Sequence, residues 1–182
     1  WVRTGRMQHR DHVNTYPLVN DTATLVWLAQ LAALELHVPQ WRFDASGAPG
    51  RPDRMVFDLD PGEGVSLPSC AQVAFLVRDA LRGMGLRAVP VTSGGSGIHV
   101  YAALDGGLTS DEASDAAHEL ARSLEADHPD GITSSMKRAV RPGRVFIDWS
   151  QNNAAKTTVC PYSMRGRIAP TVAAPRSWRE LA

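Results

Sequence analysis

Several features that direct a chain to a membrane or an oxidising compartment are scarce or absent in this 182-residue sequence. It contains two cysteines, Cys70 and Cys160, which lie far apart and outside any Cys-x-x-Cys spacing, so neither a disulfide framework nor a structural zinc site is indicated. No apolar run is long enough to span a bilayer, and the N-terminus has no signal-peptide core. We therefore expect a cytoplasmic protein, and the 43% hydrophobic content favours one domain with its own core.

Net charge is also absent, but the charges are unevenly distributed. Residues 1–131 hold ten arginines and seventeen acidic residues, a balance of −7, whereas residues 132–182 hold nine basic and two acidic residues, a balance of +7. An anion-binding stripe opposite an acidic metal-binding cluster would produce this asymmetry. A dipolar surface without any partner would produce it as well.

The N-terminal part shows little regular periodicity. Residues 1–20 are polar and basic, with Arg10 among them, and predict an exposed loop. Residues 20–36 are apolar on nearly all sides, which predicts a buried helix with Asp21 or Thr22 as its N-cap. Residues 44–53, rich in Pro and Gly, predict a surface loop.

Two further helices have clear start signals. Residues 67–85 combine Pro68 near the start, helical apolar spacing and a glycine at the end. Thr109 and Glu112 form a capping-box pattern that opens a helix reaching about Ala126. On that helix we expect His118 to be a surface residue. Strands are expected at residues 87–93 and 98–101, joined by the glycine-rich loop 94–97, and at residues 145–149 and 156–160.

The stretch at residues 54–62 organises the chain, because it reads as an apolar strand that carries two carboxylates and is stopped by Pro61 and Gly62. Side chains two residues apart in a strand point to the same face, so Asp58 and Asp60 leave the strand on one side. Oxygen-only ligands of this kind suit Mg²⁺ or Mn²⁺. A solvated Asp-x-Asp-Pro-Gly turn is the plain alternative, since these residues all favour turns.

Other segments supply parts for the same chemistry. Asp148 repeats the arrangement of a carboxylate at the end of an apolar strand. The glycine loop offers backbone N–H groups at a hairpin tip, and residues 163–167 place two guanidinium groups around a glycine. Three carboxylates for metal ions, together with hydroxyls, N–H groups and cations for a triphosphate, are what nucleotidyl transfer by two metal ions requires.

The same motifs resemble a known family. The resemblance extends over essentially all 182 residues and is carried by residues 37–42 (HVPQWR), 57–62 (FDLDPG), 92–101 (TSGGSGIHVY), 145–152 (VFIDWSQN) and 156–167 (KTTVCPYSMRGR). The sequence is similar to the polymerase domain of bacterial LigD-type end-joining proteins, within the archaeo-eukaryotic primase superfamily.

This resemblance implies an α+β fold around an RRM-like catalytic sheet with flanking helices, and a DNA-dependent polymerase or primase that adds nucleotides to a primer 3′-hydroxyl in gap filling or end joining. It implies two Mn²⁺ or Mg²⁺ ions, DNA with gaps or ends, nucleoside triphosphates, and as further partners a DNA ligase and an end-binding protein. By the same likeness the metal ligands are Asp58, Asp60 and Asp148, and the nucleotide is bound by His37, Ser93, His99, Arg141, Gln151, Arg165 and Arg167. Lys137, Arg138 and Arg144 form a basic turn that we expect to contact DNA.

Two departures from the family pattern stand out. Ser96 occupies the position in the glycine loop where many relatives carry a lysine, so we expect weaker binding of the triphosphate. Relatives also begin well before the residue matched by Trp1, so the chain reads as a single catalytic domain, residues 1–182, that lacks the family's N-terminal basic pocket for a 5′-phosphate.

Two alternative functions remain at this stage. A non-catalytic nucleic-acid-binding module could keep the same fold. A metal-dependent phosphatase using Asp58 and Asp60 is less favoured, because Gly62 stands where the haloacid-dehalogenase motif expects Thr or Val.

Overall fold

The computed structural model describes residues 1–9 and 11–182, and its centre is a six-stranded sheet. Every neighbouring pair in this sheet is antiparallel except β9 and β10, which run parallel. In spatial order the strands are β14 (Ala174–Pro175), β7 (Ala88–Thr92), β8 (Ile98–Ala103), β6 (Arg54–Pro61), β10 (Val145–Asp148) and β9 (Ile132–Thr133).

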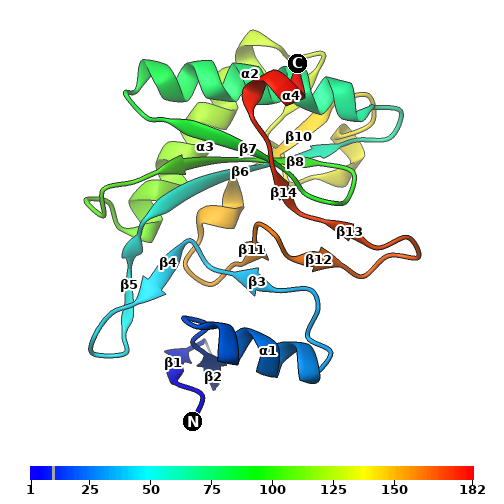
Figure 1. The fold of residues 1–182 in the computed structure, drawn as a ribbon. Helices are drawn as coiled ribbons and strands as arrows, with labels where there is room; N and C mark the ends of the chain where they lie inside the picture. Colours follow the sequence, from blue (N-terminus) through cyan, green and yellow to red (C-terminus); the bar gives the residue numbers. More distant parts are fainter. Residues whose placement is uncertain (10) are drawn as a thin grey trace.

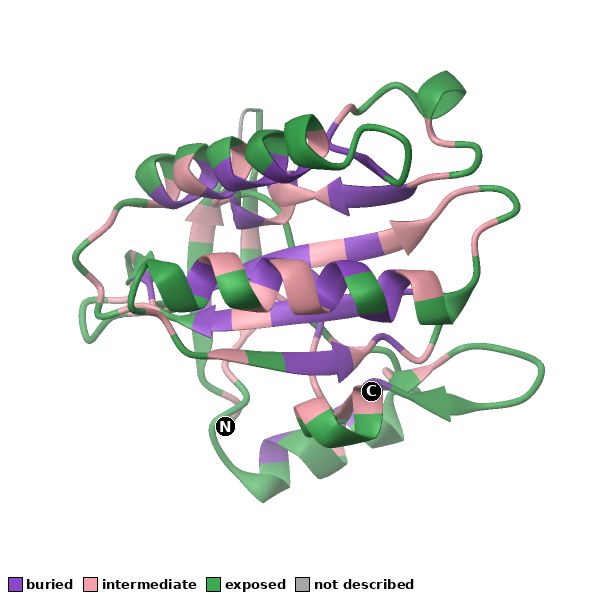
Figure 2. Ribbon diagram, turned by 90° about the horizontal axis from the view of Figure 1, so that it is seen from above, coloured by how far each residue is buried: buried purple, intermediate pink, exposed green. Residues whose placement is uncertain are grey.

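Two long helices, α2 (Leu67–Gly83) and α3 (Ser110–Asp127), cover one face of this sheet (Figure 1). Both begin and end as their sequences predict. Pro68 lies in the first turn of α2, Gly85 follows that helix with φ +78°, and Thr109 and Glu112 form a complete capping box at the start of α3. The buried stripes of both helices face the sheet and their outer sides are exposed (Figure 2).

Successive side chains of β6 point alternately into the core and to the opposite face of the sheet. Met55, Phe57 and Leu59 are fully buried and pack with α2 and α3, as do the alternating apolar residues of β8 and β10. Asp58 and Asp60 therefore point to the face away from these helices, as the two-residue period requires. The sequence prediction that both carboxylates share one side of the strand is confirmed.

Short ribbons lie on that opposite face (Figure 1). They pair β3 (His37–Val38) with β11 (Thr158–Val159), β12 (Met164–Arg165) with β13 (Thr171–Val172), and β4 (Trp41–Phe43) with β5 (Pro49–Pro52). Two 3₁₀ turns, η1 (Arg138–Val140) and η2 (Trp149–Asn152), and the short C-terminal helix α4 (Trp178–Leu181) complete the fold.

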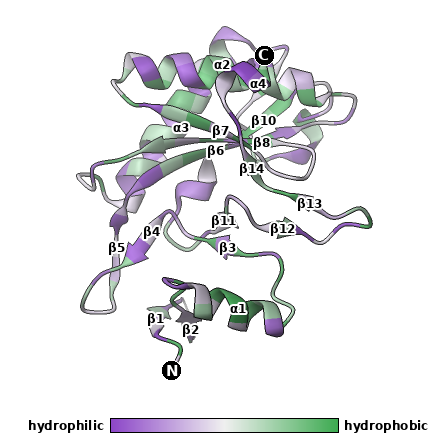
Figure 3. Ribbon diagram, viewed as in Figure 1, coloured by the Kyte–Doolittle hydropathy of each residue, from purple (hydrophilic) through white to green (hydrophobic). Residues whose placement is uncertain are grey.

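The N-terminal predictions were wrong in two respects. Residues 1–20 include a hairpin of β1 (Thr4–Gln8) and β2 (Val13–Pro17) in place of a loop, while Arg10 lies outside the described residues. The helix at residues 20–36 is shorter, α1 (Thr22–Gln30), with Asp21 as its N-cap. It is predominantly hydrophobic (Figure 3), yet only Thr24 and Leu28 are buried, because α1 lies at the periphery and not between layers.

The expected surface loop at residues 44–53 also differs, because β5 takes up its second half and pairs with β4. The expected hairpin around the glycine loop is confirmed as the pair β7 and β8. Both cysteines are free thiols. Within the described ranges, no helix is long and apolar enough to cross a membrane.

Candidate active site

Three neighbouring strands bring the predicted acidic residues together. Asp58 in β6 is directly opposite Asp148 in β10 and His99 in β8. Directly opposed residues of antiparallel strands share one face of the sheet, so all three lie on the face away from α2 and α3. The Nε2 atom of His99 is 3.2 Å from Oδ1 of Asp58. The side chain of Asp60 follows two residues further along β6.

The carboxylates repel one another. The pKa of Asp60 is raised from 3.8 to about 6, first by burial of the carboxyl group and then by the negative charges of Asp58 and Asp148. His99 and Arg141 oppose this increase only in part. A cation placed among these groups would relieve both the desolvation and the repulsion, so the donor set has the chemistry of a site for a hard divalent ion.

Asp148 is oriented by the turn that follows it. Its Oδ1 accepts hydrogen bonds from the backbone N–H of Ser150 at 3.0 Å and from its hydroxyl at 2.5 Å, and its Oδ2 accepts one from Gln151 Nε2 at 3.0 Å. Over residues 1–9 and 11–182, no group of three or more His, Cys, Asp and Glu side chains is arranged to hold a metal ion. The bonds to Ser150 and Gln151 direct the carboxylate of Asp148 toward η2.

The glycine loop closes on the buried hydroxyl of Ser93. Its Oγ accepts hydrogen bonds from the N–H groups of Gly95 and Gly97, at 3.1 and 3.3 Å. Two of the backbone N–H groups that the loop was expected to offer are therefore already engaged, but the hydroxyl proton of Ser93 remains available for donation. Gly97 permits close approach to β6, because a Cβ there would lie 2.5 Å from the carbonyl oxygen of Leu59.

Two guanidinium groups lie against the same loop. A Cβ on Gly94, which has φ +70°, would be 2.8 Å from Cγ of Arg165, and one on Gly95 would be 2.9 Å from Nη2 of Arg167. Arg165 is half-buried and its Nε lies 3.6 Å from a carboxylate oxygen of Glu35. Because glycine has no Cβ atom, Gly94 and Gly95 provide the space in which the side chains of Arg165 and Arg167 lie.

These elements enclose a hollow of about 200 Å³, which we call the nucleotide hollow. It is lined by His37, Asp58, Asp60, Ser93, Gly95, Ser96, Gly97, His99, Gln151, Thr157, Thr158, Val159, Arg165 and Arg167. The lining therefore combines two carboxylates with two guanidinium groups.

Two of the residues expected at the site do not line this hollow. Asp148 lies beside it, turned toward η2. Arg141 stacks on the ring of Phe146, with its Cζ 3.5 Å from the ring centroid, and donates from Nη2 to the carbonyl of Met136 at 2.9 Å. Phe146 is opposite Asp60 in the sheet, which explains why the charge of Arg141 acts on Asp60.

The sequence interpretation missed three lining residues, Thr157, Thr158 and Val159. They reach the hollow because β11 pairs with β3, a pairing across more than a hundred residues. Thr158 is buried, and its Oγ1 accepts from Gln40 Nε2 at 2.9 Å and lies 3.2 Å from the hydroxyl of Tyr101. No local pattern marks these contacts.

The basic turn lies next to the end of β6 but outside the nucleotide hollow. Gly62 donates its N–H to the carbonyl of Arg144 at 2.9 Å, and Gly143 donates to the carbonyl of Glu63 at 2.9 Å. A Cβ on Gly62 would lie 1.9 Å from the carbonyl oxygen of Arg141, so only glycine allows this approach. The side chains of Lys137 and Arg138 are exposed.

This geometry defines a mixed α/β protein whose candidate site, lined by both carboxylates and guanidinium groups, lies on the sheet face opposite the two long helices. The sequence model of a family described as LigD, primase-polymerase domain, matches residues 1–182. The chain therefore belongs to the LigD primase-polymerase domain family, and the resemblance drawn from its motifs is confirmed.

Similar proteins agree with this assignment. The chain is 50% identical over 186 residues to the multifunctional non-homologous end joining protein LigD of Mycobacterium bovis, an alignment that covers 100% of this chain and 24% of that protein. It is 31% identical over 172 residues to the bifunctional LigD of Bacillus subtilis, covering 94% of this chain and 28% of that protein. The chain thus spans about a quarter of the length of these curated relatives.

A solved structure described as the polymerase domain from Mycobacterium tuberculosis Ligase D in complex with DNA has a TM-score of 0.96 to this fold and 50% sequence identity. The match covers 100% of this chain and 65% of that chain. The expected mixed α/β architecture of this polymerase domain is confirmed.

Proposed function

We propose that this chain is a DNA-dependent nucleotidyltransferase of the primase-polymerase type, which adds nucleotides to a primer 3′-hydroxyl in gap filling or end joining. The observation that carries the proposal is the nucleotide hollow, which Asp58 and Asp60 line together with Ser93, Arg165 and Arg167. Family membership supports it, as does the DNA in the similar solved structure.

The basic residues that line the nucleotide hollow suit a triphosphate. Arg165 and Arg167 can donate charge-assisted hydrogen bonds to phosphate oxygens, and the hydroxyl of Ser93 can donate a further one. His37 and Gln151 line the other parts of the hollow and are proposed to contact the nucleotide there. His99 holds Asp58 through Nε2, so it orients a carboxylate as well as lining the hollow.

The carboxylates at the site suit divalent cations. Asp58, Asp60 and Asp148 are proposed to hold two Mg²⁺ or Mn²⁺ ions, with Asp148 exchanging its bonds to Ser150 and Gln151 for the cation. Bound ions of this kind lower the pKa of an attacking hydroxyl and neutralise the leaving pyrophosphate. Arg141, stacked on Phe146 beside Asp60, is proposed to reach the incoming nucleotide or the primer end.

The remaining features of the proposal concern the fold and its partners. We propose that residues 1–182 act as one catalytic domain, that the six-stranded sheet serves as an RRM-like catalytic platform, and that the domain acts on DNA gaps or ends together with a DNA ligase and an end-binding protein. Lys137, Arg138 and Arg144 are proposed to contact DNA phosphates.

Primer extension with Mn²⁺ and labelled nucleoside triphosphates tests the function. Asp58→Asn should abolish nucleotide addition, because it removes a charged cation ligand but keeps the size of the side chain. The matched control is Asp115→Asn, a change of the same kind on the exposed side of α3. Full extension by the Asp58 variant at saturating Mn²⁺ would contradict the assignment of the site.

One observation favours a second function. The carboxylate of Asp148 accepts three hydrogen bonds from Ser150 and Gln151, which suits a nucleic-acid-binding module without catalysis. Such a module would bind DNA in the same assay conditions but would extend no primer, with or without the Asp58 substitution.

A further inference from the structure

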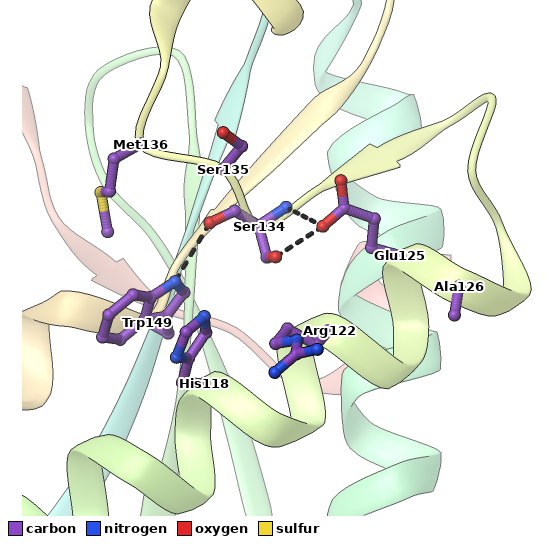
Figure 4. A pocket seen from close by; sticks show the side chains of 8 residues that line it. All are labelled: His118, Arg122, Glu125, Ala126, Ser134, Ser135, Met136 and Trp149. Atoms are coloured by element: carbon purple, nitrogen blue, oxygen red, sulfur yellow. Dashed lines mark hydrogen bonds between the residues drawn. The ribbon is translucent and has the colours of Figure 1, made fainter.

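A second and larger hollow, of about 530 Å³, lies between α3 and the segments that follow β9 and β10 (Figure 4). We call it the α3 hollow. It is lined by His118, Arg122, Glu125, Ala126, Ser134, Ser135, Met136 and Trp149. None of these residues lines the nucleotide hollow, and none was expected to be functional from the sequence.

Two stacked rings form one wall of the α3 hollow. The rings of His118 and Trp149 have centroids 3.8 Å apart and planes inclined by 15°. The indole is held in place, because its Nε1 donates to the carbonyl of Ser134 at 3.1 Å (Figure 4). His118 is half-buried, so it lies at the surface as expected while its ring packs against Trp149. A flat ring platform that is already ordered pays little conformational entropy when another ring stacks on it.

One basic side chain, Arg122, and one acidic side chain, Glu125, line the α3 hollow. Arg122 is exposed and lies one turn after His118 on the same face of α3, with a 3.4 Å surface contact to Glu119. The carboxylate of Glu125 keeps its charge but is engaged by hydrogen bonds from the opposite side of the hollow. It accepts hydrogen bonds from the N–H of Ser134 at 3.0 Å and from the hydroxyls of Ser134 and Thr133, at 2.5 and 3.0 Å. The guanidinium group of Arg122 is therefore a hydrogen-bond donor that solvent or a ligand can reach at the rim of the α3 hollow.

The α3 hollow adjoins residues of the candidate active site along the chain. Trp149 follows Asp148 directly, and Gln151 of the same 3₁₀ turn lines the nucleotide hollow. The carbonyl of Met136 accepts from Arg141, and the basic turn at residues 137–144 begins at the next residue. A strand whose phosphates cross the basic turn would thus pass the α3 hollow.

We propose that the α3 hollow binds one unpaired base of a single-stranded DNA segment, stacked on His118 with a neighbouring phosphate at Arg122. The inference deepens the proposed function, on which it rests, because the strand is the DNA on which the chain would act. Stacking platforms beside a basic track are how proteins bind single strands without sequence preference, since every base offers a flat π face. The thioether of Met136, which is exposed at this hollow, adds a polarizable contact for a ring.

Fluorescence anisotropy with a labelled oligothymidylate of about 12 nucleotides, within the usual site sizes of such grooves, tests the proposal. The measurement is made with a chelator and without triphosphates, so that no nucleotide addition occurs. A second oligonucleotide of equal length carries abasic residues in place of the bases. His118→Ala should weaken binding of oligothymidylate about tenfold and leave binding of the abasic strand almost unchanged.

Further variants distinguish the contribution of base stacking to DNA binding from that of phosphate contacts. His118→Phe keeps a ring and should retain the affinity of the unmodified chain. Arg122→Ala should weaken both oligonucleotides and reduce the slope of log affinity against log salt by about 0.7. The matched controls are Arg87→Ala and His128→Ala, exposed residues outside both hollows, which should change neither affinity. Unchanged circular dichroism and thermal midpoints exclude unfolding as the cause.

The proposal is overturned if His118→Ala weakens both oligonucleotides equally or neither of them. Displacement of oligothymidylate by millimolar dTTP from the unmodified chain but not from the His118→Ala variant would also overturn it, because the occupant would then be a free nucleotide. Failure of the proposed function gives a different result, an absence of primer extension by the unmodified chain, and leaves the His118-dependent binding intact.

Discussion

Replacement of Asp60 by asparagine removes a charge that the folded chain carries at a cost. The pKa of Asp60 is raised from 3.8 to about 6 by burial and by the charges of Asp58 and Asp148. A shift of this size corresponds to about 3 kcal/mol of destabilisation once the group is ionised. Asp60 is partly exposed, and water screens part of this energy, so we expect Asp60→Asn to raise the free energy of unfolding by about 1–2 kcal/mol at pH 7.5.

The sign of the pH dependence follows from the raised pKa. Above pH 6 the carboxylate is charged in both states, and the full cost is present in the folded chain. Between pH 6 and pH 3.8 the folded chain binds a proton that the unfolded chain does not, so its stability recovers as the pH falls. The advantage of the Asp60→Asn variant should therefore stay constant above about pH 6, shrink as the pH falls below that value and vanish near pH 4.

Urea unfolding at several pH values, in the presence of a chelator, measures this difference. Asp115→Asn is the control, because Asp115 is exposed on α3 and lies outside the nucleotide hollow. Addition of Mn²⁺ should stabilise the unmodified chain more than the Asp60 variant, since a cation removes the repulsion that the substitution relieves. If Asp60→Asn is no more stable than the unmodified chain at pH 7.5, the reasoning about repelling carboxylates is refuted.

Three further predictions concern the basic residues. Ser96→Lys adds a cation to the nucleotide hollow and should tighten triphosphate binding by about 1–3 kcal/mol, measured by calorimetric titration; equal affinities would mean that the residue does not face the phosphates. Neutralising Arg138 and Arg144 together should flatten the salt dependence of DNA binding by about two contacts, each worth a slope of about 0.7–0.9, with nucleotide affinity unchanged. Arg141→Gln should slow primer extension more than it weakens DNA binding, because its guanidinium lies over Phe146 beside Asp60; an equal effect on both measurements would make Arg141 an ordinary phosphate contact.

The N-terminal helix illustrates where reasoning from local pattern fails. Apolar residues on all sides of residues 20–36 predicted burial, yet Leu25, Val26 and Leu31 are 49%, 55% and 60% exposed. Hydrophobicity states which residues would gain from burial, but the surrounding layers decide whether a covering surface exists. Because α1 lies at the periphery of the fold (Figure 1), many of its apolar side chains stay in contact with solvent.

The local sequence by itself determined much of the scaffold and half of the candidate site. The capping box of Thr109 and Glu112 and the Pro and Gly signals around residues 67–85 predicted α3 and α2 because caps and breakers act within a few residues. The two-residue period of β6 likewise placed Asp58 and Asp60 on one face without any knowledge of the fold.

Only the tertiary structure decided which strands became neighbours. The position of Asp148 opposite Asp58, the arrival of Thr158 through the pairing of β11 with β3, and the stack of His118 on Trp149 join residues far apart in the chain. The direction of Asp148 toward Ser150 and Gln151 also depends on how η2 packs against β6, where the side chain of Asn152 bonds the backbone of Val56. Such contacts depend on which surfaces bury each other in the folded chain, and no periodicity of a single segment encodes that choice.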